Sequence, residues 1–147
     1  MIDLDHLDIL LLQETLGAGE DIKARLESWF GGWSFETLDA KGHSGGLANG
    51  WNARNVLALN VWGMDSVLGM TFIALELVGT FDVIDIYGPY LNRIPFWEKK
   101  FNCSLMRGEV MIIGGDLNFT WYLEEVWGMG RPCDTLAYHF ISIFWEL

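Results

Sequence analysis

Apolar and polar positions follow two different patterns in the first thirty residues. Residues 7–14 (LDILLLQE) form a nearly continuous apolar run of strand length, which is typical of a strand covered on both faces. Residues 19–30 (GEDIKARLESWF) instead place Ile22, Leu26 and Trp29 at helical spacing, with acidic residues near the start. The first pattern predicts a buried strand, and the second predicts an amphipathic helix.

Five short segments rich in β-forming residues come next, separated by Gly, Asn and Asp. Such punctuation is typical of turns between strands, so it predicts a meander of antiparallel strands. The five predicted strands cover residues 34–40, 44–52, 55–62, 71–79 and 81–88.

The remaining segments predict two helices around one more strand. Residues 94–107 have Pro95 near their start and apolar positions 97, 101 and 105 on one helical face. Residues 109–118 form another buried strand, and residues 135–147 have a helical period. Strands and helices do not alternate strictly, which predicts a layered α/β (α+β) sandwich with mixed or mostly antiparallel sheets.

Composition indicates a single folded domain spanning residues 1–147. Hydrophobic residues make up 51% of the chain and aromatic residues 14%, enough to build a core. Asp and Glu number 20 against 9 Lys and Arg, and the resulting net charge of −11 repels a nucleic-acid backbone at long range. A local metal site remains compatible with this charge, because such a site requires carboxylates.

Several absences in the sequence bear on localisation. Cys103 and Cys133 do not form a metal-binding motif or a disulfide framework, so we expect reduced thiols. The first residues lack the basic region of a signal peptide, and no segment approaches the ~20 apolar residues of a membrane helix. We therefore expect an intracellular protein, nuclear or cytoplasmic, without a membrane partner.

Polar side chains follow three of the predicted strands at the point where each strand ends. Glu14 comes after ILLLQ, Tyr87 after VIDI, and Asp116 and Asn118 after MIIGG. Positions 116 and 118 point the same way on a strand, and the ends of neighbouring strands meet at one rim of a sheet. Glu14 and Asp116 would supply the one or two carboxylates that Mg²⁺ needs, and the two glycines before Asp116 would allow close backbone approach.

Each of these residues also has an ordinary interpretation. An acidic residue after a buried strand is more often a turn former or a helix cap, and YGP is a common turn in which Tyr87 could place its hydroxyl in water. The set of four, in this order, is what favours a functional site.

Four motifs together carry a resemblance to a known family: LLLQET, HSGGLANGW, VIDIYGP and IIGGDLNFTW. From Leu7 to about Phe140, the chain resembles the endonuclease/exonuclease/phosphatase family, and within it the endonuclease domain of plant LINE-type (non-LTR) retrotransposons. This resemblance implies a two-sheet α/β sandwich with outer helices and a phosphodiester hydrolase that depends on Mg²⁺, with Mn²⁺ as an alternative. It also implies DNA as a partner, and a fused or neighbouring reverse transcriptase.

The resemblance also implies roles for individual residues. Glu14 would bind Mg²⁺, and Tyr87 would hydrogen-bond near the phosphate. Asp116 would lie near the metal and orient or deprotonate the attacking water, and Asn118 would position Asp116 and contact the transition-state oxygens. His43 lies in a loop where relatives often have arginine and could touch phosphate, although an ordinary loop residue is the simpler interpretation.

The chain departs from the family pattern in three places. An asparagine on a strand before LQET and an Asp-His pair on a later strand are absent, and Tyr90 stands where many relatives have asparagine. His139 lies in an aromatic, helical context, which indicates a packed or surface histidine. We therefore expect a partial domain with an incomplete second sheet and little or no activity alone.

Two further hypotheses stay open from the sequence. One is a noncatalytic remnant, an interaction protein that binds a partner through an exposed sheet face. The other is an active phosphodiesterase that acts on a small phosphorylated substrate, for which the net charge of −11 would matter less than for DNA.

Overall fold

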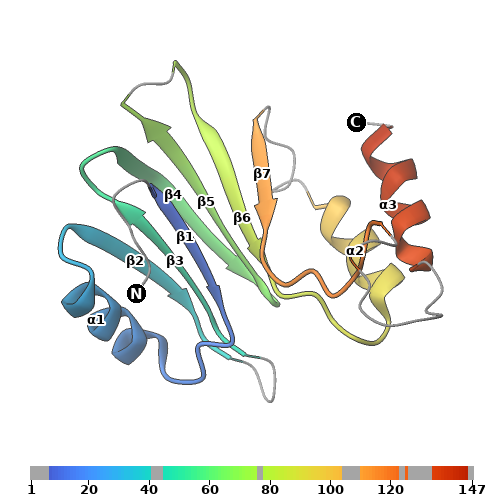
Figure 1. Ribbon diagram of the computed structural model, residues 1–147, viewed down its shortest axis with the longest axis horizontal. Helices are drawn as coiled ribbons and strands as arrows, with labels where there is room; N and C mark the ends of the chain where they lie inside the picture. Colours follow the sequence, from blue (N-terminus) through green and yellow to red (C-terminus); the bar gives the residue numbers. More distant parts are fainter. Residues whose placement is uncertain are drawn as a thin grey trace. The chain divides into compact units, whose positions relative to one another are not determined.

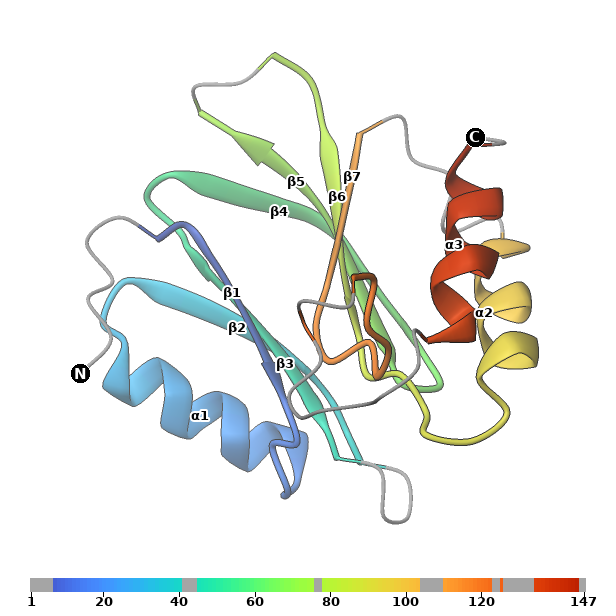
Figure 2. The ribbon, with the colours of Figure 1, turned by 45° about the vertical axis from the view of Figure 1, so that its right-hand side comes forward.

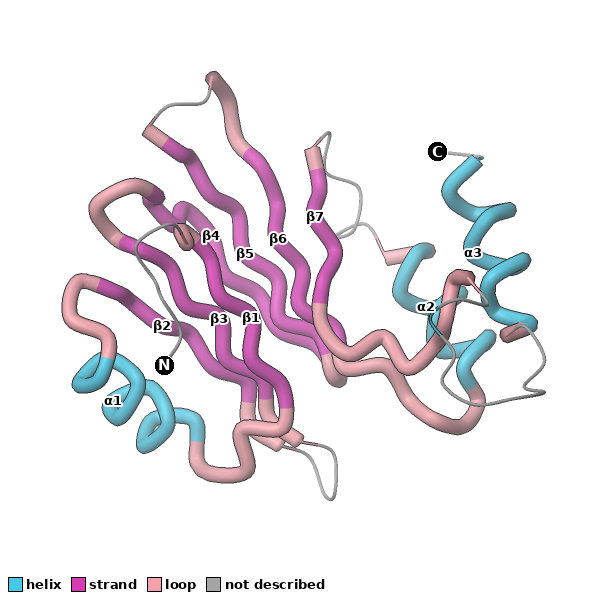
Figure 3. The backbone as a smooth tube through the Cα atoms, in the orientation of Figure 1, coloured by secondary structure: helices cyan, strands magenta, loops and turns pink. Residues whose placement is uncertain are grey.

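The computed structural model describes residues 7–40, 45–75, 78–103, 110–122, 125 and 134–145. The chain divides into two compact units. The first contains residues 1–87 and 107–116, and the second contains residues 88–106 and 117–147. Figure 1 labels the helices and strands, and Figure 3 distinguishes strands, helices and loops by colour.

The first unit contains two β-sheets. In the three-stranded sheet, β3 (Leu47–Asn52) pairs antiparallel with both β1 (Ile9–Gln13) and β2 (Trp33–Leu38). The four-stranded sheet has the order β4-β5-β6-β7, with bounds Val56–Met64, Val67–Ala74, Phe81–Ile86 and Met111–Gly114. Strands β4, β5 and β6 form an antiparallel meander, and β7 runs parallel to β6. The predicted mixed architecture is confirmed.

The inner faces of the two sheets share one apolar core. Met70, Phe72 and Val83 of the four-stranded sheet are almost fully buried, and Ile9 and Leu11 of β1 pack against them. Burial of such side chains is the main favourable contribution to folding, at about 1.5–3 kcal/mol each.

Helix α1 (Gly19–Trp29) covers the outer face of the three-stranded sheet (Figure 2). Leu26 of α1 packs with Phe35 of β2 and Ala48 of β3, and Leu10 and Leu12 of β1 join this second cluster. Alternate residues of β1 therefore face the helix and the other sheet, which explains the continuous apolar run of residues 7–14.

The second unit contains α2 (Arg93–Phe101) and α3 (Thr135–Trp145). Its core is aromatic: the Trp97 ring lies 4.7 Å from that of Phe140, and the Phe119 ring stacks on Phe140 at 4.2 Å between centroids. Trp97 is fully buried. The helical face predicted from positions 97 and 101 is present, since these two rings stack at 5.8 Å.

Some predicted boundaries differ from those observed. The helix predicted over residues 94–107 ends at Phe101, and position 105 lies outside the described residues. The strand predicted over 71–79 is β5, which begins at Val67 and ends at Ala74. Among the described residues, no helix is long and apolar enough to cross a membrane.

Candidate active site

Glu14 and Tyr87 come from different sheets of the first unit and meet through their side chains. The Tyr87 hydroxyl donates a hydrogen bond of 2.6 Å to Glu14 Oε1, across 73 positions of sequence. Glu14 follows the last residue of β1, and Tyr87 follows the last residue of β6. The structure thus brings together two of the four residues singled out from strand ends.

The backbone around Glu14 is unusual. Its φ of 56° lies in the left-handed region, which costs a residue with a Cβ roughly 1–2 kcal/mol. Gly45 lies directly against it: a Cβ on Gly45 would come within 2.4 Å of the Glu14 Cα. The turn that carries Glu14 therefore packs closely against the segment that leads into β3, and only glycine fits at position 45.

A cavity of about 260 Å³ is lined by residues that contact each member of this pair. Its lining includes Gly45, which packs on Glu14, and Ser66, whose carbonyl accepts a 2.9 Å hydrogen bond from the Tyr87 backbone N–H. Leu47 and Met64 supply apolar lining. The lining also contains two acidic residues, Asp39 and Asp65.

Asp116 belongs to the same unit and is exposed. It follows Gly115, whose φ of 115° is accessible to glycine but rarely to other residues. A Cβ on Gly115 would lie 2.3 Å from the Ile86 carbonyl oxygen and 2.6 Å from Asp85 Oδ1. The chain segment leading to Asp116 therefore runs tightly against the end of β6, next to Tyr87.

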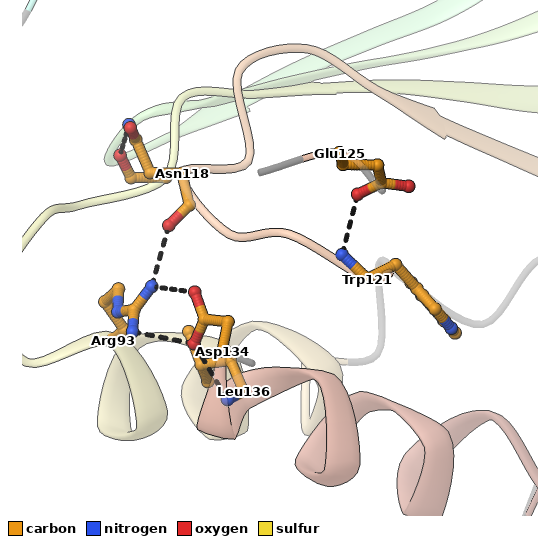
Figure 4. Close-up of polar contacts among 7 residues, drawn as sticks. Arg93, Asn118, Trp121, Glu125, Asp134 and Leu136 are labelled. Carbon is orange, nitrogen blue, oxygen red and sulfur yellow. Dashed lines mark hydrogen bonds and ion pairs between the residues drawn. The ribbon is translucent and has the colours of Figure 1, made fainter. Parts of the chain in front are cut away.

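Asn118 lies in the second unit, where a polar network holds its loop (Figure 4). Its side-chain amide donates a 2.6 Å hydrogen bond to the Gly88 carbonyl, and its φ of 52° is left-handed. Its carbonyl accepts a 2.9 Å bond from Arg93 Nη1.

Arg93 also binds Asp134 through both terminal nitrogens, at 2.6 and 2.9 Å. Burial opposes ionisation of Asp134, but the bonds from Arg93 and from the Leu136 N–H hold the pKa of this carboxyl below its ordinary value.

The structure gives no support to a functional role for His43 or His139. His43 lies outside the described residues. His139 is half-buried on α3 in the second unit, in agreement with a packed histidine. Among the described residues, no group of three or more His, Cys, Asp or Glu side chains is gathered as a ready-made metal site.

Sequence reasoning missed a buried polar cluster beneath the candidate site. Asp85 is fully buried between the sheets, and Gln13 Nε2 donates a 2.6 Å hydrogen bond to its Oδ1. Burial raises the pKa of Asp85 to about 7, opposed by the hydrogen bond from Gln13. A signal was present in the sequence: position 85 shares the inward-facing phase of Phe81 and Val83, where an acidic residue is out of place.

Comparison with known proteins identifies the fold. Neither a protein-family model nor a curated protein sequence matches the chain. Several solved structures are similar to this chain. One is ANGEL2, a 2′,3′-cyclic phosphatase, with a TM-score of 0.55 and 17% identity over 76% of this chain and 39% of that chain. Another is an endonuclease/exonuclease/phosphatase family protein from Bacteroides thetaiotaomicron, with a TM-score of 0.57 and 13% identity over 78% and 50% of the two chains.

The third is the catalytic domain of human Nocturnin with bound sulfate, with a TM-score of 0.54 and 14% identity over 92% and 56% of the two chains. The chain has the endonuclease/exonuclease/phosphatase fold. It spans 39–56% of the length of these three structures. The similarity therefore covers part of the fold of those structures. In this chain β1 and β7 are edge strands of their sheets.

Proposed function

We propose that this chain carries part of the active site of a metal-dependent phosphodiester hydrolase of the endonuclease type. The observation that carries the proposal is the hydrogen bond between Tyr87 and Glu14, which joins the ends of strands from two sheets beside a cavity. The motifs LLLQET and VIDIYGP contain these same two residues.

The donor set suits a hard cation. Mg²⁺ takes one or two carboxylates, keeps several waters and shares a substrate phosphate, so it does not require three gathered side chains. Glu14 and Asp116 are exposed carboxylate residues of one unit. Tyr87 donates to Oε1 of Glu14, and the Glu14 side chain is exposed. Bound Mg²⁺ would neutralise negative charge on the phosphoryl oxygens.

The protein groups would then have separate roles. Glu14 and Asp116 hold the metal, and Tyr87 fixes the orientation of the Glu14 carboxylate through its 2.6 Å bond. Asp116 would also orient the attacking water or accept its proton as the water oxygen bonds to phosphorus and the ester oxygen leaves. The family's histidine has no counterpart among the residues that the motifs match, so we expect weak activity or none from this chain alone, because catalytic groups that act as a unit fail together.

Binding of Mn²⁺, monitored by the loss of its free electron paramagnetic resonance signal, tests the proposal. We expect wild-type protein to bind the ion, and Glu14→Gln and Asp116→Asn to weaken binding at least about tenfold. Glu98→Gln, which removes one exposed carboxylate from α2, is the matched control and should bind like the wild type. Equal affinity in all four proteins would refute the metal site.

DNA as the substrate rests on the likeness to LINE-type endonucleases, and the charge of −11 opposes it. A plasmid-nicking assay with Mg²⁺ distinguishes the substrates: nicking that Asp116→Ala abolishes supports DNA cleavage. Hydrolysis of a small phosphodiester, such as bis(p-nitrophenyl) phosphate, without nicking would instead favour a small substrate. Asp39 and Asp65 in the cavity lining favour a neutral or cationic group there over a second phosphate.

The second candidate function is that of a noncatalytic interaction protein. The observation in its favour is the apolar surface of β4, an edge strand on which Leu57, Leu59 and Val61 are 59%, 50% and 41% exposed. Sedimentation analysis tests this candidate. A concentration-dependent oligomer that Leu59→Lys dissociates, together with no Mn²⁺ binding, would favour it over the hydrolase.

A further inference from the structure

A buried polar cluster of Gln13, Asn49 and Asp85 lies between the two sheets. Asp85 is 0% exposed and Asn49 is 1% exposed. Gln13 Nε2 donates to Asp85 Oδ1 at 2.6 Å, and Asn49 Nδ2 donates to the Leu68 carbonyl at 3.2 Å. Leu68 is the pairing partner of Asp85 in the β5–β6 ladder. Asn49, from the three-stranded sheet, therefore bonds to the residue that pairs with Asp85 in the four-stranded sheet.

Two oxygens of this cluster have no hydrogen-bond partner among the described residues: Asp85 Oδ2 and Asn49 Oδ1. Buried polar atoms without a partner are rare, because each costs about 1–3 kcal/mol. A proton on Asp85 would turn its Oδ2 from an acceptor into a donor and would remove the buried charge. The neutral acid is therefore the form of Asp85 that this environment accommodates.

Three chain segments that carry candidate active-site residues converge on this carboxyl. Gln13 immediately precedes Glu14, and Asp85 lies two residues before Tyr87 on β6. Gly115, the residue before Asp116, approaches so closely that a Cβ would lie 2.6 Å from Asp85 Oδ1.

We propose that Asp85 is a positioning residue of the candidate site, which fixes the ends of β1, β6 and β7 relative to one another through Gln13 and Gly115. Its relevance to metal binding rests on the function proposed above, but its effect on the Glu14–Tyr87 hydrogen bond does not. A core residue without this role would affect stability alone.

The test compares variants in two measurements, Mn²⁺ affinity and the ¹³C resonance of the Tyr87 ring, assigned with Tyr87→Phe. Asp85→Asn keeps the volume and an oxygen that accepts from Gln13, while its amide N–H replaces the acid proton. Asp85→Leu removes the hydrogen bond from Gln13. Val83→Ala creates a cavity on the same face of β6 without touching Gln13 or Gly115, and is the matched control for lost stability.

We expect Asp85→Leu to shift the Tyr87 resonance toward that of an exposed tyrosine and to weaken Mn²⁺ binding about tenfold, as is typical when a group that orients a ligand is lost. Asp85→Asn should leave the Tyr87 resonance at its wild-type position. Its Mn²⁺ affinity should stay within about twofold of the wild type. Gln13→Met, which leaves Asp85 in place but removes its donor, provides the same test should Asp85→Leu not fold.

The outcomes separate the two proposals. If wild-type protein binds no Mn²⁺ but Asp85→Leu or Gln13→Met shifts the Tyr87 resonance, the metal site fails and the positioning role stands. If these variants lower stability as Val83→Ala does, while the Tyr87 resonance and the Mn²⁺ affinity stay unchanged, Asp85 is a core residue only and the inference is wrong.

Discussion

Replacing Asp85 by asparagine should change how the stability of the first unit depends on pH. Asp85 is fully buried, and its pKa in the folded protein is about 7 against an ordinary value of 3.8. The folded protein therefore keeps a proton that the unfolded chain loses between these two pH values. Since the folded state binds more protons there, the free energy of unfolding falls as the pH rises from about 4 to 7.

The size of this effect follows from the two pKa values. Each pKa unit corresponds to about 1.4 kcal/mol, so the rise from 3.8 to about 7 corresponds to about 4 kcal/mol across the full range. Well above pH 7 Asp85 is ionised in both states, so it causes no further change in the free energy of unfolding. Asparagine does not titrate, so the Asp85→Asn variant should lack this slope and gain stability relative to the wild type as the pH rises.

Urea titrations at intervals between pH 4.5 and 8.5 measure the effect. Trp51 packs against Phe72 in the core between the sheets, so tryptophan fluorescence reports on this region. Asp82→Asn, which removes a carboxylate from the opposite face of the same strand, is the control. Parallel profiles for wild type and Asp85→Asn would refute the reasoning, and an equal flattening by Asp82→Asn would show that burial of Asp85 is not the cause.

Two other substitutions test packing and charge elsewhere. Arg93→Met should cost the second unit about 2 kcal/mol in urea unfolding near pH 7, because it removes two charge-assisted bonds to Asp134. Because the pKa of Asp134 is lowered in the folded protein, the stability contributed by these two bonds is present above about pH 4 and is lost below it. The difference between the wild type and Arg93→Met should therefore shrink on acidification, and the bond from Arg93 to the Asn118 carbonyl accounts for what remains. Gly50→Ala should cost about 1–3 kcal/mol, since its Cβ would lie 2.3 Å from Phe35 Cε1, whereas Gly31→Ala meets nothing within 4 Å and should be tolerated.

Much of the fold is readable from local patterns, because each pattern reports on the faces of one element. The apolar run ending at Gln13 and the helical spacing from Ile22 to Leu26 correspond to β1 and α1. Pairing between elements is less accessible. Residues 53–55 join β3 to β4 as an ordinary turn, yet the chain changes sheet at this point. A turn does not encode whether the next strand pairs with the last one or crosses to another sheet.

The candidate site shows the same division. Strand-end positions single out Glu14 and Tyr87, and their hydrogen bond needs the tertiary structure to be seen. Asp85 was missed because the strand FDVIDI was interpreted by its overall apolar character, without asking which face each position occupies. Its partner Gln13 lies 72 positions away, at a separation that no local pattern reports.

Features that cost stability coincide with the residues proposed for function. Glu14 adopts a left-handed backbone conformation, which costs about 1–2 kcal/mol. Asp85 buries a carboxyl whose neutral state the unfolded chain does not favour at neutral pH. Glycine at position 14 would relieve the first of these costs, and asparagine at position 85 would relieve the second. Glu14 and Asp85 both lie at or next to strand ends of the first unit, which favours a functional site there over a set of ordinary turns.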